Sequence, residues 1–592
     1  MCGIFGIIQP NAPAATLLAH GTQASGLLAH RGPDQSGLEQ GQGWLLSHRR
    51  LSIYDLSEKG RQPLHYQGLR IIFNGAIYNF PELKRELLNL GYAFRSKTDT
   101  EVILAAYQEW GTECFARFNG MWSLAILDEA QQTLVLSRDR IGIKPLYLYQ
   151  DDGLLAFASE PKALRNTLGQ GNELQLEVVS DFLRFGWQDH RPETIWAGIR
   201  QFPAGHFAVC SLHQPDTLSY TAYYQLPEQE DYSGEKTTLI QLRSLLEDSV
   251  RLRSRSDVGC GLTLSGGVDS SSIASVLGPE HRTYSALFRG TPYDESPYVD
   301  AVIDHTGQPN HSLFPAWQDF TMHYQACTIG QDQPLASAAV VIHYRLMQLV
   351  KEKGEKVILN GQGADEIGAG YDKFYPPYLR EMITKGLFAS TKAAVNLVRQ
   401  WRIAPDKLAG RLQRRLAPTA ATSFLAPALR APTSFRQPLD VDVRTTSLNL
   451  LNGMGLPVLL RHEDRSTMAF GIESRPPFLD YRIVALLLQA PADFKLKHGM
   501  RKWGIRESVR SLLPKQVYQR KRKLGFATPQ HRWLEAHADF FLTGLRQYTR
   551  TPGAFLSPQA IPFATRVLAR RQTRYYAQIW RWWAWAVFHQ ID

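Results

Sequence analysis

LTLSGGVDSS, residues 262–271, has the pattern of a strand end, a tight turn with two glycines and the first turn of a helix. The backbone N–H groups of such a turn point outward beside the positive end of the helix, where an anion is bound favourably. The stretch is not a Walker A loop, because it lacks the G-x-x-x-x-G-K-[ST] pattern. It therefore predicts a phosphate cradle of a different kind, with an ordinary strand-to-helix turn as the alternative.

The residues SGGVDSS resemble the PP-loop of ATP pyrophosphatases, enzymes that cleave ATP to AMP and pyrophosphate. The resemblance implies that this loop holds the pyrophosphate portion of ATP and that Asp269 helps to hold Mg²⁺. The ATP-binding residues expected from this stretch are Leu264, Ser265, Gly266, Gly267, Asp269, Ser270 and Ser271.

A second turn, LNGQGADE at residues 359–366, follows another predicted strand. Paired carboxylates at the carboxyl end of a strand suit a magnesium ion that itself grips phosphates. We therefore expect Asp365 to be a metal ligand together with Asp269, and Asn360 and Gly361 to lie beside ATP. A solvated acidic turn is the alternative, and it is less favoured because both turns end strands of one predicted sheet.

The run RKWGIRESVRSLLPKQVYQRKRK, residues 501–523, contains nine Lys or Arg residues and one Glu. Such a run is often a solvated face or a nucleic-acid-binding surface. Beside an ATP site it can also supply a cation that neutralises the triphosphate and the pyrophosphate leaving group. We expect Lys521 to have this catalytic role.

The pattern around these motifs predicts an α/β domain over residues 238–592. Strands and helices alternate after an amphipathic helical stretch at 236–254, which is typical of a doubly wound parallel sheet. Beyond about residue 380 the chain is largely helical in pattern. The polar, turn-rich residues 213–237 are predicted to be a linker.

Residues 1–212 have a different pattern, in which short apolar or alternating runs are separated by Gly, Pro and Asp turns. This pattern is typical of a layered β structure. Two helical stretches interrupt it, one at 81–92 that starts with Pro and one at 99–111 that ends with Gly. The N-terminal region is therefore predicted to be a separate, mainly β domain.

The chain begins MCGIFGII, with Cys2 directly after the initiator Met. Removal of Met1 leaves a free α-amine on the residue that carries the thiol, and this amine can act as the base that the thiol needs. FNGAIYN, residues 73–79, offers the side-chain N–H of Asn74 and the backbone N–H of Gly75 as an oxyanion hole. Taken alone, Cys2 is better explained as a buried structural thiol. Together with Asn74 and Gly75, it is better explained as a nucleophile.

Four elements in this order, MCGIFG, HRGPD (30–34), HRRLSI (48–53) and NGAIYN (74–79), resemble class II glutamine amidotransferases. The glutaminase of that class is an N-terminal-nucleophile αββα sandwich. A substrate with an α-carboxylate and an α-ammonium group needs opposite charges to hold it. We therefore expect Arg50, Asn74, Gly75 and Asp99 to bind glutamine.

With the PP-loop domain added, the whole chain resembles the glutamine-hydrolysing asparagine synthetase family. Further stretches carry the same resemblance: RDRIGIKPLY (138–147), ASEPKAL (158–164), HEDRSTMAFGIESRPPFLD (462–480) and KLGFATP (523–529). The family implies that Cys2 attacks the glutamine amide to give a thioester and ammonia. It also implies that Mg-ATP adenylates a carboxylate, aspartate by default, and that ammonia crosses an internal tunnel to displace AMP. A dry route keeps ammonia unprotonated.

Two positions depart from the family pattern. Many asparagine synthetases have Glu where this chain has Ala76, and well-studied members have a Glu where this chain has Gln362. A Gln cannot act as a general base, but we expect Gln362 to orient ammonia by hydrogen bonds. The GQGADE form resembles a bacterial branch placed in surface-polysaccharide and natural-product pathways, so another carboxylate is the alternative acceptor.

Composition adds broad expectations about partners and compartment. The net charge of +11 permits nucleic-acid binding, so a non-catalytic nucleic-acid-binding or regulatory protein is a less favoured alternative. No apolar run reaches the ~18 residues of a membrane span, and the aromatic-rich tail at 574–590 fits a packed last helix better than a membrane-surface helix. Five scattered cysteines favour a reduced, cytoplasmic protein. We expect ATP and Mg²⁺ as cofactors and no nucleic-acid or membrane partner. The family resemblance offers a homodimer as the candidate assembly.

Overall fold

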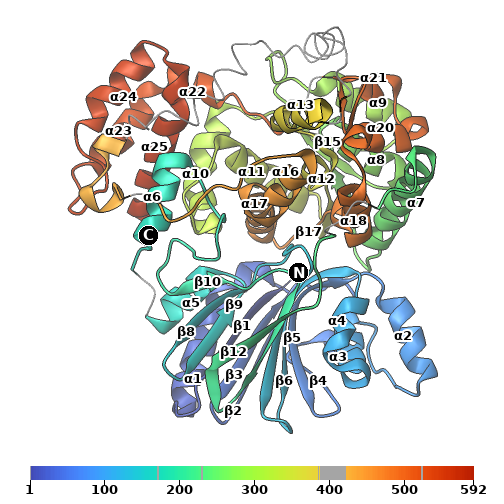
Figure 1. The fold of residues 1–592 in the computed structure, drawn as a ribbon. Coiled ribbons are helices and arrows are strands. Elements are labelled where there is room, and N and C mark those ends of the chain that lie inside the picture. Colours follow the sequence, from blue (N-terminus) through green and yellow to red (C-terminus); the bar gives the residue numbers. More distant parts are fainter. Residues whose placement is uncertain are drawn as a thin grey trace.

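Two six-stranded sheets lie face to face in the N-terminal part of the chain (Figure 1). The computed structural model describes residues 2–169, 173–227, 231–384, 386, 422–431, 433–521 and 525–591. In order, the first sheet contains β10 (Ile199–Gln201), β8 (Tyr147–Asp151), β9 (Leu154–Ala158), β1 (Gly3–Ile8), β3 (Trp44–Arg50) and β2 (Gln35–Gly41). The second contains β12 (Gln214–Ala222), β11 (His206–Ser211), β7 (Thr133–Arg138), β6 (Gly120–Asp128), β5 (Leu69–Ile77) and β4 (Leu64–Tyr66).

Helices cover the outer faces of both sheets. Helices α1 (Ala14–Leu27) and α5 (Pro161–Leu168) pack on the first sheet, and α3 (Asp99–Trp110) with α2 (Phe80–Asn89) packs on the second. Alternate apolar side chains of both sheets point inward and form one buried core between them, as expected for strands with two-residue periodicity. The αββα sandwich and both helices predicted in this region are confirmed.

The predicted linker is wrong for residues 214–222. These residues form β12, which pairs antiparallel with β11 at the edge of the second sheet. The strand is polar and mostly exposed because one of its sides is a sheet edge, so its sequence lacks the apolar alternation of an inner strand. Helix α7 (Glu235–Ser254) follows, and the division into two domains at this point stays a prediction.

A five-stranded parallel sheet forms the centre of the second part, in the order β15-β14-β13-β16-β17. Its strands are β13 (Cys260–Thr263), β14 (Thr283–Ala286), β15 (Asn310–Leu313), β16 (Val357–Leu359) and β17 (Glu473–Arg475). The helices that pack around it include α7, α8 (Val268–Leu277), α9 (Ser296–Thr306), α11 (Ala338–Glu352) and α17 (Leu456–Met468). The predicted doubly wound parallel sheet is confirmed.

The remaining C-terminal region is helical, as predicted. Helices α22 (Gln530–Ala536), α23 (Ala538–Tyr548), α24 (Ala560–Ala569) and α25 (Tyr576–Ile591) pack together with α10 (Trp317–Gln331) and α6 (Leu176–Phe185). Four tryptophans of α25 are buried in this cluster, which confirms the packed last helix. Within the described ranges, none of the helices combines the length and the apolar character that a membrane crossing requires.

Candidate functional site

Cys2 lies at the start of β1, beside the middle of β5. Its backbone N–H donates to Asn74 Oδ1 at 2.9 Å, and Arg31 Nε donates to its carbonyl at 3.1 Å. The side chain is 6% exposed and faces a small cavity of about 30 Å³ that Gly75 also lines. Cys2 is therefore held on both sides of its peptide unit, and the structure brings together Cys2, Asn74 and Gly75 as predicted from the sequence.

The thiol of Cys2 is not activated by its surroundings alone. Burial raises its pKa, against the opposing effects of a backbone hydrogen bond from Leu51 and the charge of Arg50. A buried thiol needs a base nearby before it attacks well. This environment is consistent with the expected role of the α-amine of Cys2 once Met1 is removed.

Three of the predicted glutamine-binding residues, Arg50, Gly75 and Asp99, line this cavity, whereas Asn74 is not among its lining residues. The charged groups of Arg50 and Asp99 already have protein partners. Arg50 donates from Nη2 to the carbonyls of Tyr54 (3.0 Å) and Asp55 (2.6 Å), and from Nη1 to Gln35 Oε1 (2.7 Å). Asp99 Oδ2 accepts from the backbone N–H of Ile77 at 3.0 Å. These contacts fix the cation and the anion at one pocket, and their contact with glutamine stays a prediction.

The two predicted binding groups on β5 and α3 have distinct environments. Asn74 uses its Oδ1 for Cys2, and its Nδ2 lies 3.4 Å from Ser123 Oγ, so one amide hydrogen is available for an oxyanion. Burial, aided by the charge of Glu473, raises the pKa of Asp99 to about 6, against the opposing effects of the backbone N–H groups of Ile77 and Asp99 and the charge of Arg475. Asp99 is therefore a carboxylate whose charge changes just below neutral pH.

One residue of the second part of the chain also lines the Cys2 cavity. Glu473, the first residue of β17, lies in its wall beside Asp99 and Tyr54. Burial alone would raise the pKa of Glu473, but nearby positive charges, Arg475 and Lys144 among them, lower it to about 2. Sequence analysis missed this residue, although GIESRPPFLD, which contains it, was one of the family-like stretches. The pocket beside Cys2 is thus completed by a residue from the second part of the chain.

A buried ion cluster joins the two parts next to Cys2. Arg31 Nη1 lies 2.8 Å from both Glu160 Oε1 and Asp464 Oδ2. Arg465 Nη1 lies 2.6 Å from Glu160 Oε1. These four side chains are almost completely buried. Each part of the chain contributes one cation and one anion: Arg31 and Glu160 come from the N-terminal part, and Arg465 and Asp464 come from α17. The stretches HRGPD, ASEPKAL and HEDRSTM therefore meet in space, which the sequence could not show.

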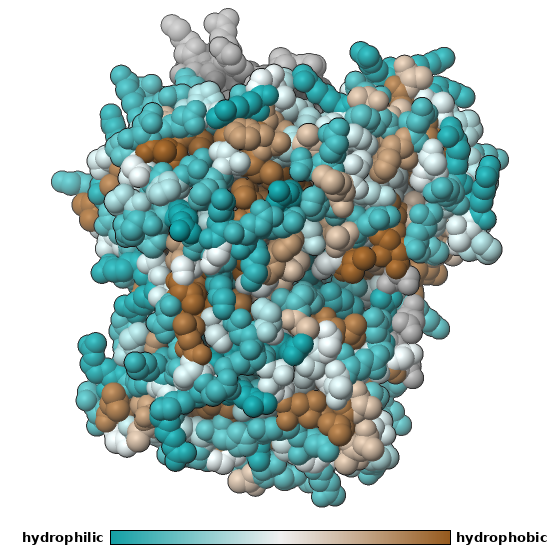
Figure 2. Space-filling view, turned by 180° about the vertical axis from the view of Figure 1, so that it is seen from behind, coloured by the Kyte–Doolittle hydropathy of each residue, from teal (hydrophilic) through white to brown (hydrophobic). Residues whose placement is uncertain are grey.

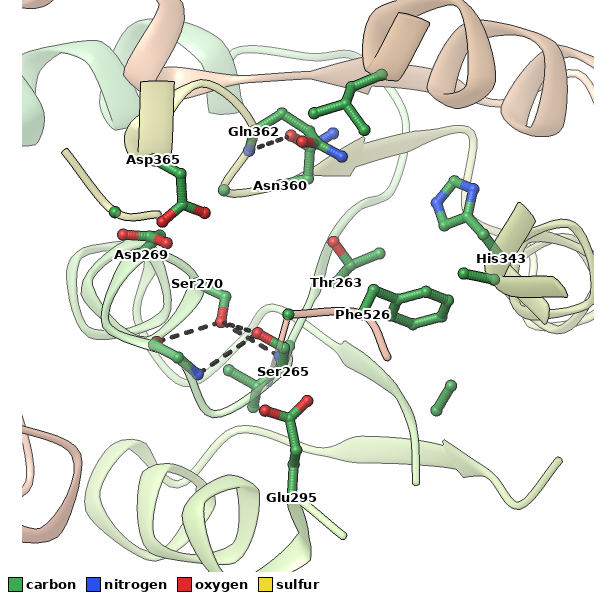
Figure 3. Close-up of a pocket in the computed structure, with 18 of the residues that line it drawn as sticks. Thr263, Ser265, Asp269, Ser270, Glu295, His343, Asn360, Gln362, Asp365 and Phe526 are labelled. Carbon is green, nitrogen blue, oxygen red and sulfur yellow. Dashed lines mark hydrogen bonds between the residues drawn. The ribbon is translucent and has the colours of Figure 1, made fainter. Parts of the chain in front are cut away.

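The glycine-rich turn after β13 lines a second, larger cavity of about 440 Å³ (Figure 3). Ser265 and Ser270 bridge the turn, with their Oγ atoms 3.2 Å apart and the backbone N–H of Ser265 donating to Ser270 Oγ at 3.2 Å. Gly266 has a φ of 62°, and a Cβ there would lie 2.6 Å from the Cβ of Tyr298. Only glycine fits this conformation and this close approach.

Both predicted turns contribute to this cavity. A Cβ on Gly361 would lie 2.9 Å from Asp269 Cβ, which shows how closely the turn after β16 approaches the one after β13. The predicted residues in the cavity wall are Leu264, Ser265, Gly267, Asp269, Ser270, Asn360, Gly361, Gln362 and Asp365. Gly266 and Ser271 are not among its lining residues, and Ser271 is buried in α8.

The two predicted metal ligands lie opposite one another and share a lysine. Lys502 Nζ lies 2.6 Å from Asp269 Oδ2 and 2.9 Å from Asp365 Oδ1. Burial lowers the pKa of Lys502, against the opposing effect of Asp269. Asp269 Oδ1 is buried and has no hydrogen-bond partner in the described part of the chain, so its free lone pairs fit a hard cation such as Mg²⁺.

The protein alone offers too few ligands for a closed metal cage. Among the described residues there is no group of three or more His, Cys, Asp or Glu side chains that could hold a metal ion. Mg²⁺ is commonly bound by one or two carboxylates together with substrate phosphates. Asp269 and Asp365 therefore fit an ion that arrives with a nucleotide.

The cations of the cavity differ from the one predicted. Lys521 is exposed and is not among the lining residues; its carbonyl accepts from Arg501 Nη2 at 3.2 Å. The lining cations are Arg501, Lys502, Arg506 and Arg520. The sequence run at 501–523 located this basic wall correctly, but the position of each side chain depends on short helices and on Lys502, which is left-handed at φ 53°. A catalytic role of Lys521 stays a prediction.

The opposite wall is formed by α11, α17 and residue Phe526. His343 faces the cavity from α11 with its ring 6.1 Å from that of Phe526 (Figure 3). Glu463 of α17 receives a hydrogen bond from Asn360 Nδ2 at 2.9 Å, and the backbone N–H of Gln362 donates to Asn360 Oδ1 at 3.0 Å. Neither His343 nor Glu463 was expected in the site. A lone His on a helix carries no motif, and Glu463 lies in the family-like stretch 462–480, to which no role was attached.

Comparison with known proteins gives two consecutive matches. Residues 1–224 match a family model described as a glutamine amidotransferase domain, and residues 241–590 match one described as asparagine synthase. Asparagine synthetase [glutamine-hydrolyzing] 1 of Bacillus subtilis (strain 168) is 29% identical over 588 residues, which cover 93% of this chain and 90% of that protein. Asparagine synthetase B of Escherichia coli (strain K12) is 30% identical over 405 residues, covering 63% and 65%.

Other similarities are weaker. Amidase chry2 of Gibberella zeae is 26% identical over 578 residues, covering 86% of this chain and 84% of that protein. Among solved structures, the glutamine phosphoribosylpyrophosphate amidotransferase of B. subtilis complexed with ADP and GMP aligns with a TM-score of 0.29 and 13% identity, over 61% of this chain and 81% of that chain. A structural likeness this low carries no argument about function.

Proposed function

This chain belongs to the asparagine synthase family, and from that premise we propose that it adenylates L-aspartate and converts it to asparagine with ammonia from glutamine, releasing AMP and pyrophosphate. Glutamine-dependent amidation driven by ATP follows from the family. The identity of the acceptor, the products of ATP cleavage and the need for Mg²⁺ are the parts that we propose here.

The observation that carries this proposal is the direct connection between the two pockets. Arg31 binds the carbonyl of Cys2 and also Asp464 of α17. The preceding residue of α17, Glu463, lines the larger cavity. On β17, Glu473 lines the Cys2 cavity while the next residue, Ser474, donates to Glu463 at 2.7 Å. The Cys2 cavity and the larger cavity therefore share α17 and β17. This arrangement supports the transfer of ammonia from the first cavity to the second.

We assign the residues of the Cys2 cavity to glutamine hydrolysis. Cys2 attacks the side-chain amide, its α-amine takes the thiol proton, and Asn74 with Gly75 stabilises the oxyanion. Arg50 and Asp99 hold the α-carboxylate and the α-ammonium group of glutamine. The released ammonia stays unprotonated only if water is excluded from its path.

In the larger cavity we assign the turn after β13 to the pyrophosphate portion of ATP. Mg²⁺ would supply neutralisation of the phosphate charge, and Asp269 and Asp365 would hold it. Lys502, which pairs with both carboxylates in this structure, would turn to the phosphates. Arg520, which binds the carbonyl of Gly266 at 3.1 Å, keeps the loop in place beside them.

The test is a product balance with the full chain. Incubation with ATP, MgCl₂, L-glutamine and L-aspartate is expected to give equal amounts of asparagine, AMP, pyrophosphate and glutamate. Formation of ADP instead of AMP would contradict the PP-loop assignment. The absence of both asparagine and AMP would contradict aspartate as the acceptor.

One observation favours a second candidate, the same chemistry on another carboxylate. All four Lys and Arg residues that line the cavity come from residues 501–520. Lys502 binds Asp269, Arg520 binds the carbonyl of Gly266, and Arg506 binds the carbonyls of residues 517 and 518. Arg501 pairs with Asp372 and donates to the carbonyl of Lys521. Among the described lining residues, α11 and α17 offer only His343, His462 and Glu463 as ionisable groups. An acceptor without a second carboxylate, such as a sugar acid, would fit this wall. Exchange of pyrophosphate into ATP with a panel of carboxylates distinguishes the two.

A further inference from the structure

Amination in the larger cavity creates a proton that some group must accept. When ammonia bonds to the acyl carbon of an adenylate, its nitrogen becomes an ammonium group that must lose a proton before the amide is stable. Gln362 lines the cavity, but a side-chain amide is not a base at neutral pH. Another residue near Gln362 is therefore needed.

The carboxylates on the phosphate side are engaged with cations. Asp269 and Asp365 both pair with Lys502, and they are the groups that fit Mg²⁺. Glu295 pairs with Arg520 at 2.5 Å, on the far side of the cavity from Gln362 (Figure 3). A base among these would be neutralised by its partner.

The wall formed by α11 and α17 carries a carboxylate–imidazole pair. Glu463 Oε2 lies 3.3 Å from His343 Nε2. Its other oxygen, Oε1, accepts from Asn360 Nδ2 at 2.9 Å and from Ser474 Oγ at 2.7 Å, so the carboxylate is fixed. The side chains of His343 and Glu463 are 16% and 9% exposed, which makes the imidazole the more accessible group. His462 also lies near this pair, and burial holds its pKa well below the usual range, so it stays neutral.

The pair lies where ammonia would enter. Ser474, which binds Glu463, follows Glu473 in the wall of the Cys2 cavity. Asn360 links the carboxylate of Glu463 to the backbone N–H of Gln362. A path for ammonia from the Cys2 cavity along β17 would therefore arrive at the wall that carries Gln362 and His343.

We propose that His343 accepts the proton released when ammonia attacks the acyl adenylate, and that Glu463 positions its ring. The nitrogen–carbon bond forms, the bond from the acyl carbon to the phosphate oxygen breaks, and AMP leaves with that electron pair. One proton passes from nitrogen to the imidazole, and the Glu463 carboxylate stabilises the imidazolium. This inference rests on the proposed adenylation.

Three rates measured on the full chain separate this role from others. Pyrophosphate exchange into ATP, with L-aspartate or with the most active carboxylate of the panel, reports adenylation alone. Amide formation from ammonium chloride reports attack by ammonia. Hydroxamate formation from hydroxylamine reports capture of the same adenylate by a nucleophile whose adduct is far more acidic and loses its proton without a strong base.

His343→Gln is expected to lower the ammonia-dependent rate by about 100-fold and to leave exchange and hydroxamate formation close to wild type. Glu463→Gln is expected to lower it by about 10-fold, since the imidazole remains but is less well oriented. Glu463→Asp, which keeps a carboxylate at this position of α17 beside His343, is expected to lose less of this rate than Glu463→Gln. Glu352→Gln, an exposed change on α11, is the matched control and should change nothing.

Each other outcome has a definite meaning. Parallel loss of the ammonia and hydroxylamine rates, or loss of exchange in His343→Gln, would overturn the proton-acceptor role, and so would an unchanged ammonia rate. An ammonia-dependent rate of Glu463→Asp as low as that of Glu463→Gln would overturn the assignment of Glu463. If the wild-type chain shows no exchange with any carboxylate, the proposed function itself fails, and this inference fails with it.

Discussion

The Cys2 cavity and the phosphate cavity differ in size and in how their charges are held. The first has a volume of about 30 Å³ and the second about 440 Å³. In the first, the two charged groups from the N-terminal part bind mainly backbone atoms, as Asp99 does with Ile77, whereas Glu473 pairs with a cation, Arg475. In the second, opposite charges bind one another, as Lys502 does with Asp269 and Asp365. The first arrangement suits one small substrate. The second suits a nucleotide, because ion pairs such as those of Lys502 can open and redistribute their charges when phosphates arrive.

The two cavities are nevertheless not independent. Glu473 and Asp464 come from the second part of the chain, yet one lines the Cys2 cavity and the other binds the arginine that holds Cys2. The connection is electrostatic and buried, where a charge that loses its partner costs several kcal/mol. A substitution confined to one cavity should therefore remove either glutamine hydrolysis or adenylation and leave the other activity. A substitution in an element that both cavities share should lower the transfer of ammonia between them.

The largest expected effect is the loss of the Cys2 thiol. Cys2→Ala should lower glutamine-dependent amidation by a factor on the order of 10⁴ or more, because the nucleophile of a covalent step is removed. Amidation with ammonium chloride should stay near the wild-type rate, since the larger cavity is untouched. Cys210→Ala, a change of a buried thiol in β11, is the control. Equal loss of both activities would contradict the separation of the two cavities.

The converse change is Asp269→Asn in the larger cavity. Pyrophosphate exchange into ATP should fall by about 100-fold or more, because the site loses a ligand for Mg²⁺ and a partner for Lys502. Hydrolysis of glutamine in the absence of ATP should stay unchanged. Asp304→Asn on the exposed side of α9 is a matched control, and an Asp269→Asn enzyme with normal exchange would show that this carboxylate is not a metal ligand.

These two sets of residues show what the sequence could predict. Asp269 and Asp365 meet because both turns end neighbouring parallel strands, so topology rules are enough for this pair. Cys2 meets Asn74 and Gly75 because β1 and β5 lie in two facing sheets, and the family resemblance, not periodicity, predicted that these residues act together. The sandwich and the parallel sheet followed from the same patterns and from the family resemblance.

Other residues could not be located in this way. Lys502 itself has a left-handed backbone conformation just before the short helix α20 (Trp503–Ser508), and it pairs with Asp269. The sequence does not show this local conformation, and by charge alone Lys521 is an equally good candidate. Glu473 and Arg31 act across the two parts of the chain, and their partners depend on how those parts dock. The strand β12 was mistaken for a linker because an edge strand lacks the apolar pattern of an inner one.

Glu473→Gln tests the connection from the side of the Cys2 cavity. We expect kcat/KM for glutamine to fall by about 10-fold, because a charged group next to Asp99 and Arg475 is replaced by a neutral one in a buried wall. The ammonia-dependent rate should change little. Glu280→Gln, an exposed carboxylate before β14, is the control. A normal glutamine response in Glu473→Gln would mean that the second part of the chain only closes the pocket sterically.

The pH dependence of glutamine use distinguishes the cavities without a mutation. Burial raises the pKa of Asp99 to about 6, so this carboxylate becomes neutral as the pH falls through that value. If only the charged form binds the α-ammonium group of glutamine, kcat/KM for glutamine should fall towards a limit of about tenfold per pH unit below pH 6. The ammonia-dependent rate, corrected for the concentration of free ammonia, should lack this step. A glutamine profile that is flat from pH 7 to 5 would contradict the role of Asp99.

The smallest expected effect comes from an exposed ion pair between the same two parts. Lys356 Nζ lies 2.8 Å from Asp34 Oδ2, and the two side chains are 29% and 27% exposed. Water screens such a pair, so Lys356→Ala should cost less than about 1 kcal/mol and leave the ratio of glutamine-dependent to ammonia-dependent activity unchanged. Asp464→Ala removes the buried partner of Arg31 and should lower both that ratio and the apparent Tm clearly. If Lys356→Ala uncouples the activities as strongly as Asp464→Ala, then general docking of the two parts, and not the buried cluster at Cys2, controls their communication.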